Sequence, residues 1–133
     1  MKPEDFVKNC NSEHCHQVAF FCWARLQENI NQFPGLDLMF AIPNGGERNL
    51  KVAAQMKAEG VKAGVLDIFL PVAKGAFHGL FIELKVGNNK PSVKQLEFAT
   101  EVSYQGFAIA LCYGWEQAVQ AVKKYYAYGP FML

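Results

Sequence analysis

Apolar and polar residues recur along the chain with two different periods, and these periods predict both helices and strands. After Ser12, apolar side chains return every three or four positions, which is the spacing of one helix face. Short apolar runs bounded by glycine, proline or asparagine predict strands. In chain order we expect a helix from Glu13 to the Phe33-Pro34-Gly35 break, a strand over 38–42, a helix over 47–59, strands over 65–72 and 80–86, a helix from Ser92 to Gly106, a strand over 107–113 and a helix over 115–126.

The lengths of the connections predict how the strands pair. The strands at 65–72 and 80–86 are joined too closely for anything but an antiparallel hairpin. A helix separates the strands at 80–86 and 107–113, so these two should be parallel, with a right-handed crossover. The sequence therefore predicts one α/β domain over residues 1–133, in which helices flank a small mixed sheet.

The hairpin carries three charged residues in an otherwise apolar stretch. Because successive side chains on a strand point to opposite faces, Glu83 and Lys85 share one face and Ile82 and Leu84 the other. Hairpin pairing would place Asp67 beside Glu83. Two carboxylates are hard oxygen ligands of the kind that Mg²⁺ prefers, and a metal there can activate water and stabilise charge on a phosphate. Lys85 would face the same pocket and assist the attacking water.

The pattern of charges alone leaves a second interpretation open. Glu83 and Lys85 can instead lie on a solvated sheet face and form a cross-strand ion pair with Asp67. Gln95 has two interpretations as well, because Ser92-x-x-Gln95 is the spacing of a helix capping box. Its amide serves the pocket only if it also reaches the carboxylates.

Composition and charge narrow the class of protein. The chain has 133 residues, of which 51% are hydrophobic, which allows a proper core. The 13 Lys and Arg residues nearly balance the 12 Asp and Glu residues, which excludes a histone-like polycation but not a local basic patch. No apolar run is long enough to span a membrane, and the N-terminus lacks the layout of a signal peptide. We therefore expect a cytoplasmic protein whose four cysteines are reduced.

Cysteine and histidine residues near the N-terminus raise the question of a zinc site. The residues concerned are Cys10, His14, Cys15, His16 and Cys22. They include no paired C-x₂-C unit, and three consecutive side chains cannot all point at one ion. The spacing therefore argues against zinc.

Several short segments occur in a characteristic order along the chain. They are Ser12-Glu13-His14 followed by Trp23, Asn44-Gly45-Gly46-Glu47-Arg48, Gly60 to Asp67, Phe81 to Lys85, and Ser92 to Gln95. Together they make the chain similar to the virus-type replication-repair nuclease (VRR-NUC) family, from about Glu13 to about Trp115. The resemblance implies the PD-(D/E)XK restriction-endonuclease-like fold. One departure is Leu66, where the family usually has proline; leucine can also hold the extended backbone required there.

The resemblance assigns roles to individual residues. It implies that Glu13, Asp67 and Glu83, with the Leu84 carbonyl, hold Mg²⁺ or Mn²⁺. It implies a catalytic role for Lys85 and for Gln95 as well. Asn44, Gly45, Gly46 and Arg48 match a loop expected to meet DNA, and we add Lys51 and Lys62 as candidate phosphate contacts.

The resemblance also implies an activity and partners. Stand-alone members of the family tend to cut branched DNA, such as Holliday junctions, as homodimers. We therefore expect a metal-dependent endonuclease in the cytoplasm of a bacterial or phage-infected cell, with no membrane partner. A non-cleaving DNA-binding module on the same fold is the alternative. The apolar segment from Tyr125 to Leu133 is a candidate dimer surface, unless it folds back onto its own core.

Overall fold

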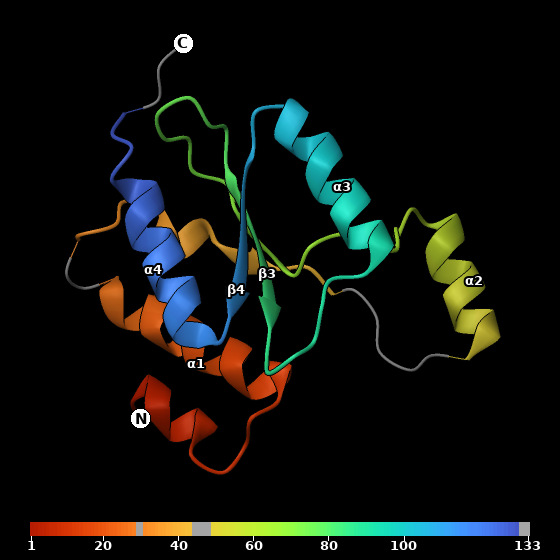
Figure 1. The fold of residues 1–133 in the computed structure, drawn as a ribbon, viewed down its shortest axis with the longest axis horizontal. Coiled ribbons are helices and arrows are strands. Elements are labelled where there is room, and N and C mark those ends of the chain that lie inside the picture. The colour runs from red at the N-terminus through yellow and green to blue at the C-terminus, as the bar shows by residue number, and fades with distance from the viewer. Residues whose placement is uncertain (29–30, 44–48, 131–133) are drawn as a thin grey trace.

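A mixed four-stranded sheet, with helices on both faces, forms the centre of the molecule (Figure 1). The computed structural model describes residues 1–28, 31–43 and 49–130. Its helices and strands are α1 (Glu13–Gln27), β1 (Phe40–Ala41), α2 (Leu50–Ala58), β2 (Ile68–Leu70), β3 (Leu80–Lys85), α3 (Val93–Tyr104), β4 (Ala108–Tyr113) and α4 (Trp115–Tyr126), with 3₁₀ turns η1 (Pro3–Val7) and η2 (Leu36–Leu38).

The sheet has the strand order β1-β2-β3-β4. Strand β2 pairs antiparallel with both β1 and β3, whereas β3 and β4 are parallel and are joined through α3. Both the predicted hairpin and the predicted parallel pair are therefore confirmed. Strand β3 runs between β2 and β4, which places Glu83 and Lys85 inside the sheet and away from its edges.

The two faces of the sheet bury different side chains. On one face, Ile68 and Ile82 contribute to the main core, which α1 and α4 cover with residues that include Phe20 and Val122. On the other face, aromatic rings pack against one another beneath α3. The contacts include Phe81 with Phe98 of α3 at 5.5 Å and Phe69 with Phe81 at 4.5 Å between ring centroids. The side chains of Glu83 and Lys85 alternate with Ile82 and Leu84 and so lie on this aromatic face.

Helix α2 projects from the rest of the molecule (Figure 1). None of its residues is buried, and Leu50 at its start is 90% exposed. Gly60, with φ +99°, ends it as the sequence predicts, and the Val61 N–H donates to the Met56 carbonyl at 2.9 Å. None of the described helices is long and apolar enough to cross a lipid bilayer.

Several predicted boundaries differ from the observed ones. Helix α1 ends at Gln27, before the proline break, and the strand expected over 38–42 is reduced to the two residues of β1. The preceding residues form η2 instead, which Gly35 enters with a left-handed φ of +86°. The strand predicted over 107–113 forms β4, which is an edge strand despite its apolar sequence, with Leu111 44% exposed.

One further expectation, that all four cysteines are reduced, is wrong. Cys10 and Cys15 form a disulfide around the turn that caps α1, with their Cα atoms 6.1 Å apart, whereas Cys22 and Cys112 are free thiols. The apolar C-terminal segment, whose role was left open, is partly folded back, because Tyr125 lies in the core while Tyr128 is 47% exposed. Tyr125 is 1% exposed and its hydroxyl donates to the Val72 carbonyl at 2.5 Å. Residues 131–133 lie outside the described residues.

Candidate active site

The register of the β2–β3 hairpin brings Asp67 and Glu83 together. Ile68 pairs with Ile82, so the preceding Asp67 lies opposite Glu83. Each carboxylate accepts a hydrogen bond from a backbone N–H on the opposite side of the hairpin. The Asp67 N–H donates to Glu83 Oε1 at 3.2 Å, and the Leu84 N–H donates to Asp67 Oδ2 at 2.9 Å. The backbone thus fixes both carboxylates.

Lys85 completes a buried cluster of charged side chains. Its Nζ lies 3.1 Å from Glu83 Oε2, and the two side chains are only 13% and 3% exposed. The interpretation of Glu83 and Lys85 as a solvated ion pair is therefore wrong, because α3 and the neighbouring strands exclude most water from Glu83. Burying charges is unfavourable unless they are paired or bind a metal, so the cluster needs a functional or structural reason.

Gln95 both caps α3 and contacts Glu83, the two interpretations that the sequence left open. Its Oε1 accepts the Ser92 N–H at 2.8 Å while its own N–H donates to Ser92 Oγ at 3.1 Å, which completes the capping box of α3. Its Nε2 simultaneously donates to Glu83 Oε2 at 2.9 Å. The start of α3 therefore orients the same carboxylate oxygen that Lys85 contacts.

Glu13 approaches the cluster from the first turn of α1. The Ser12 hydroxyl caps this helix by accepting the Cys15 N–H at 3.1 Å. Glu13 Oε2 accepts a hydrogen bond from Asn89 Nδ2 at 3.1 Å. Asn89 lies in the loop after β3, and no short motif in the sequence singles it out.

Three charged groups of the cluster, Asp67, Glu83 and Lys85, have shifted pKa values. Burial raises the pKa of Asp67, against the opposing effects of the Leu84 N–H donor and the Lys85 charge. Burial, followed by the charge of Asp67, raises the pKa of Glu83 to about 7. Burial alone would lower the pKa of Lys85, but the hydrogen bond and charge of Glu83 raise it, and the charge of Glu13 adds to this.

The excess of carboxylates fits a divalent cation. Asp67, Glu83 and Glu13 would bring three negative charges to the cluster. Lys85 is the positive charge that acts on the pKa values of Asp67 and Glu83. Carboxylate oxygens are the ligands that Mg²⁺ and Mn²⁺ favour. Within residues 1–28, 31–43 and 49–130, no three His, Cys, Asp or Glu side chains are already gathered as ligands of one ion. The Asp67–Glu83 pair is therefore the nucleus of the candidate metal site, and Glu13 lies outside that pair.

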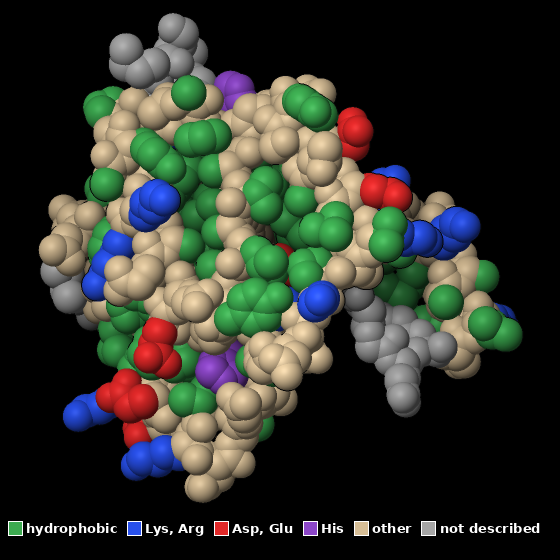
Figure 2. Space-filling model, in the orientation of Figure 1, with side chains coloured by type: hydrophobic (Ala, Val, Ile, Leu, Met, Phe, Trp, Pro, Cys, Tyr) green, Lys and Arg blue, Asp and Glu red, His purple; other side chains and the backbone are tan. Residues whose placement is uncertain are grey.

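The predicted DNA contacts are only partly visible. Asn44, Gly45, Gly46 and Arg48 lie outside the described residues. Lys51, on α2, and Lys62, after it, are both exposed. Lysine side chains also gather around the projecting α2 in the space-filling view (Figure 2).

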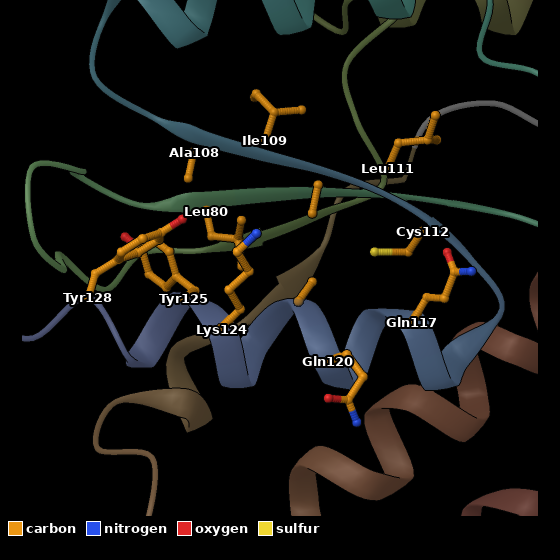
Figure 3. Close-up of a pocket in the computed structure, with 12 residues that line it drawn as sticks. Leu80, Ala108, Ile109, Leu111, Cys112, Gln117, Gln120, Lys124, Tyr125 and Tyr128 are labelled. Atoms are coloured by element: carbon orange, nitrogen blue, oxygen red, sulfur yellow. The ribbon is translucent and has the colours of Figure 1, made fainter.

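A cavity of about 380 Å³ lies elsewhere, between β4 and α4 (Figure 3). It opens on the sheet face opposite Glu83 and is lined by residues that include Ala108, Cys112 and Tyr125. Burial raises the pKa of the Cys112 thiol to about 11, which keeps it protonated and unreactive at neutral pH. None of the predicted catalytic residues lines this cavity.

Comparison with known proteins supports the assignment of the fold. No family model and no curated protein matches the chain. Among solved structures, a VRR_NUC domain protein is 28% identical to it and superposes with a TM-score of 0.77. The alignment covers 91% of this chain and 93% of that one. The chain therefore has the PD-(D/E)XK nuclease-like fold, and this similarity supports its resemblance to the VRR-NUC family.

Proposed function

We propose that the chain is a metal-dependent, structure-specific DNA endonuclease that hydrolyses phosphodiester bonds, with branched DNA such as Holliday junctions as its substrate. The observation that carries this proposal is the buried pair of Asp67 and Glu83, to which Lys85 and Gln95 are both hydrogen-bonded through Glu83 Oε2. The similarity to a VRR_NUC domain protein supports nuclease chemistry.

The residues of the cluster divide into metal ligands and groups that act on the substrate. Asp67, Glu83, Glu13 and the Leu84 carbonyl would hold Mg²⁺ or Mn²⁺. The bound ion would supply an activated water and stabilise the charge that develops on the phosphate. Lys85 presents an ammonium group on the same face, where it orients the attacking water and stabilises negative charge in the transition state.

Gln95 is a positioning residue in this mechanism. Its amide is held by the capping box of α3, so it presents Nε2 to Glu83 in one orientation. Lys51 and Lys62, with Arg48 and the adjacent Asn44-Gly45-Gly46 segment, would contact DNA phosphates near the cluster.

The direct test is cleavage of labelled DNA by the wild-type protein. A four-way junction, a flap and a plain duplex are incubated with Mg²⁺, with Mn²⁺ and with EDTA. We expect cuts in the junction with either metal and none in EDTA, because removal of the ion leaves no activated water. Intact binding to junction DNA without cleavage in either metal would overturn the proposal and favour a non-cleaving, structure-specific DNA-binding module.

We further propose that the active protein is a homodimer, because a two-fold dimer presents two identical sites to the two strands of a junction. The outer edge of β4 is the surface best suited to a second copy. Its sequence, from Ala108 to Tyr113, contains no charge and no proline, the usual devices that block edge-to-edge pairing. Antiparallel pairing of two β4 strands would satisfy free backbone groups and bury Leu111, which is 44% exposed.

Placing a charge on this edge is expected to dissociate the dimer. In Leu111→Lys, each copy would bring a lysine into the paired edge, so the mass measured by light scattering should fall from dimer to monomer. Leu26→Lys is the matched control, because Leu26 is 51% exposed on α1, outside the sheet edge. A wild-type monomer, or a Leu111→Lys protein that stays dimeric, would contradict this interface.

A further inference from the structure

Asn89 connects two parts of the candidate site that are far apart in the sequence. It lies in the loop between β3, which carries Glu83 and Lys85, and α3. Its side chain reaches across to α1, where Nδ2 donates to Glu13 Oε2 at 3.1 Å over a separation of 76 residues. This is the hydrogen bond that the structure shows for the Glu13 carboxylate.

The backbone holds Asn89 in place for this contact. The Asn89 N–H donates to the Val86 carbonyl at 3.2 Å, which closes a turn directly after β3. Gly87, inside this turn, has a φ of +58°, which is a left-handed conformation that glycine adopts without a steric penalty. The loop is therefore shaped so that the chain leaving β3 presents Asn89 to Glu13.

The start of α1 does not need this contact in order to form. Ser12 already caps the helix, and the disulfide between Cys10 and Cys15 already closes the turn before it. A free glutamate side chain at the first helical position would rotate among several conformations. The hydrogen bond from Asn89 selects among them, and Glu13 is near enough for its charge to act on Asp67 and Lys85.

We propose that Asn89 is a positioning residue that orients the Glu13 carboxylate toward the divalent cation site formed by Asp67 and Glu83. This inference rests on the proposed metal-dependent function. Outer partners that orient metal-ligating side chains are known to affect metal affinity by roughly 10–100-fold. Asn89 has the geometry of such a partner, because it donates to one oxygen and leaves the other free to turn to the ion.

The test is a calorimetric titration of the full-length protein with Mn²⁺ in the absence of DNA. We expect Asn89→Ala to weaken Mn²⁺ binding by roughly 10-fold or more, with the thermal midpoint in EDTA unchanged. Asn89→Asp, which has the same shape but replaces the donor with an acceptor, should weaken it as well. Asn88→Ala is the matched control, because Asn88 is an exposed asparagine in the same loop, as Asn89 is, and this variant should bind Mn²⁺ like the wild type.

A double-mutant cycle separates positioning of Glu13 from any other effect. In a Glu13→Ala background, Asn89→Ala should cause no further loss of Mn²⁺ affinity, because its target is gone. Equal affinity of wild type and Asn89→Ala, or an undiminished effect in the Glu13→Ala background, would overturn the role of Asn89 while leaving the nuclease proposal intact. If the wild type binds no Mn²⁺ at all, the proposed metal-dependent function falls and this inference falls with it.

Discussion

The Asp67→Asn variant is expected to keep its fold and bind DNA, yet to cut junction DNA about 10³-fold more slowly than the wild type. A metal contributes several kcal/mol of transition-state stabilisation, and each 1.4 kcal/mol corresponds to about a tenfold change in rate. Asparagine retains a side-chain oxygen that can accept the Leu84 N–H, now bonded to Asp67 at 2.9 Å. The local structure should therefore survive while an anionic ligand is lost.

This prediction is checked by single-turnover cleavage with saturating protein, beside a binding assay in EDTA. Asp37→Asn is the matched control, since Asp37 is an exposed aspartate in η2 and should cut like the wild type. A cleavage rate for Asp67→Asn within tenfold of the wild-type rate would show that Asp67 is not the central metal ligand.

The second large effect concerns stability in the absence of metal. Glu83→Gln should raise the free energy of unfolding in EDTA at pH 8, although it should abolish cleavage. The pKa of Glu83 rises from 4.5 to about 7 on folding, which corresponds to a penalty of at most about 3 kcal/mol for the ionised form. Glutamine removes the charge, but it has one acceptor oxygen where the carboxylate has two, and it forfeits the ion pair with Lys85, so we expect a smaller net gain of about 1 kcal/mol.

The sign of the pH dependence follows from the raised pKa. A carboxyl group whose folded-state pKa is raised stabilises the fold fully below its unfolded pKa, and this stability is lost as the pH rises through the folded pKa. Wild-type protein in EDTA should therefore lose stability between about pH 4.5 and pH 7, and Glu83→Gln should lose less over this range, because only the raised pKa of Asp67 then contributes.

Urea denaturation at pH 4.5, 6 and 8 measures both effects. The control is Glu97→Gln, since Glu97 is exposed on α3 and should behave like the wild type. Destabilisation by Glu83→Gln at pH 8 would show that the Lys85 ion pair outweighs the desolvation of the carboxylate. Added Mn²⁺ should stabilise the wild type and not Glu83→Gln, since only the wild type binds the ion.

The parts of the site that follow from local alternation were predictable. Glu83 and Lys85 share a face because strand side chains alternate, and the close hairpin connection places Asp67 opposite Glu83. The capping box of Gln95 follows from its spacing to Ser92, because a first helical turn places those positions together. In each case a short stretch of chain determines the geometry.

Features that depend on tertiary contacts were not predictable. Asn89 meets Glu13 only after the whole sheet has formed, so no local pattern marks it. Strand β4 has the apolar composition of a central strand but lies at the edge, because strand order is set by packing and not by composition. The disulfide between Cys10 and Cys15 was not predicted, because the expectation of reduced cysteines came from the expected cytoplasmic location. The short separation of the two cysteines along the chain was not considered.

The pairing of Ile68 with Ile82 has a consequence for how the chain tolerates insertions. Because side chains alternate with a period of two, a slip of one residue within β3 would turn Glu83 and Lys85 toward the apolar core and expose Ile82 and Leu84. Such a slip would remove the charged cluster and disrupt the core at once. A residue added in the turn between β2 and β3, where Lys74 and Phe77 form an isolated bridge, leaves this parity unchanged. We therefore expect the site to tolerate inserted residues in the turn between β2 and β3. An inserted residue inside β3 should destroy the site.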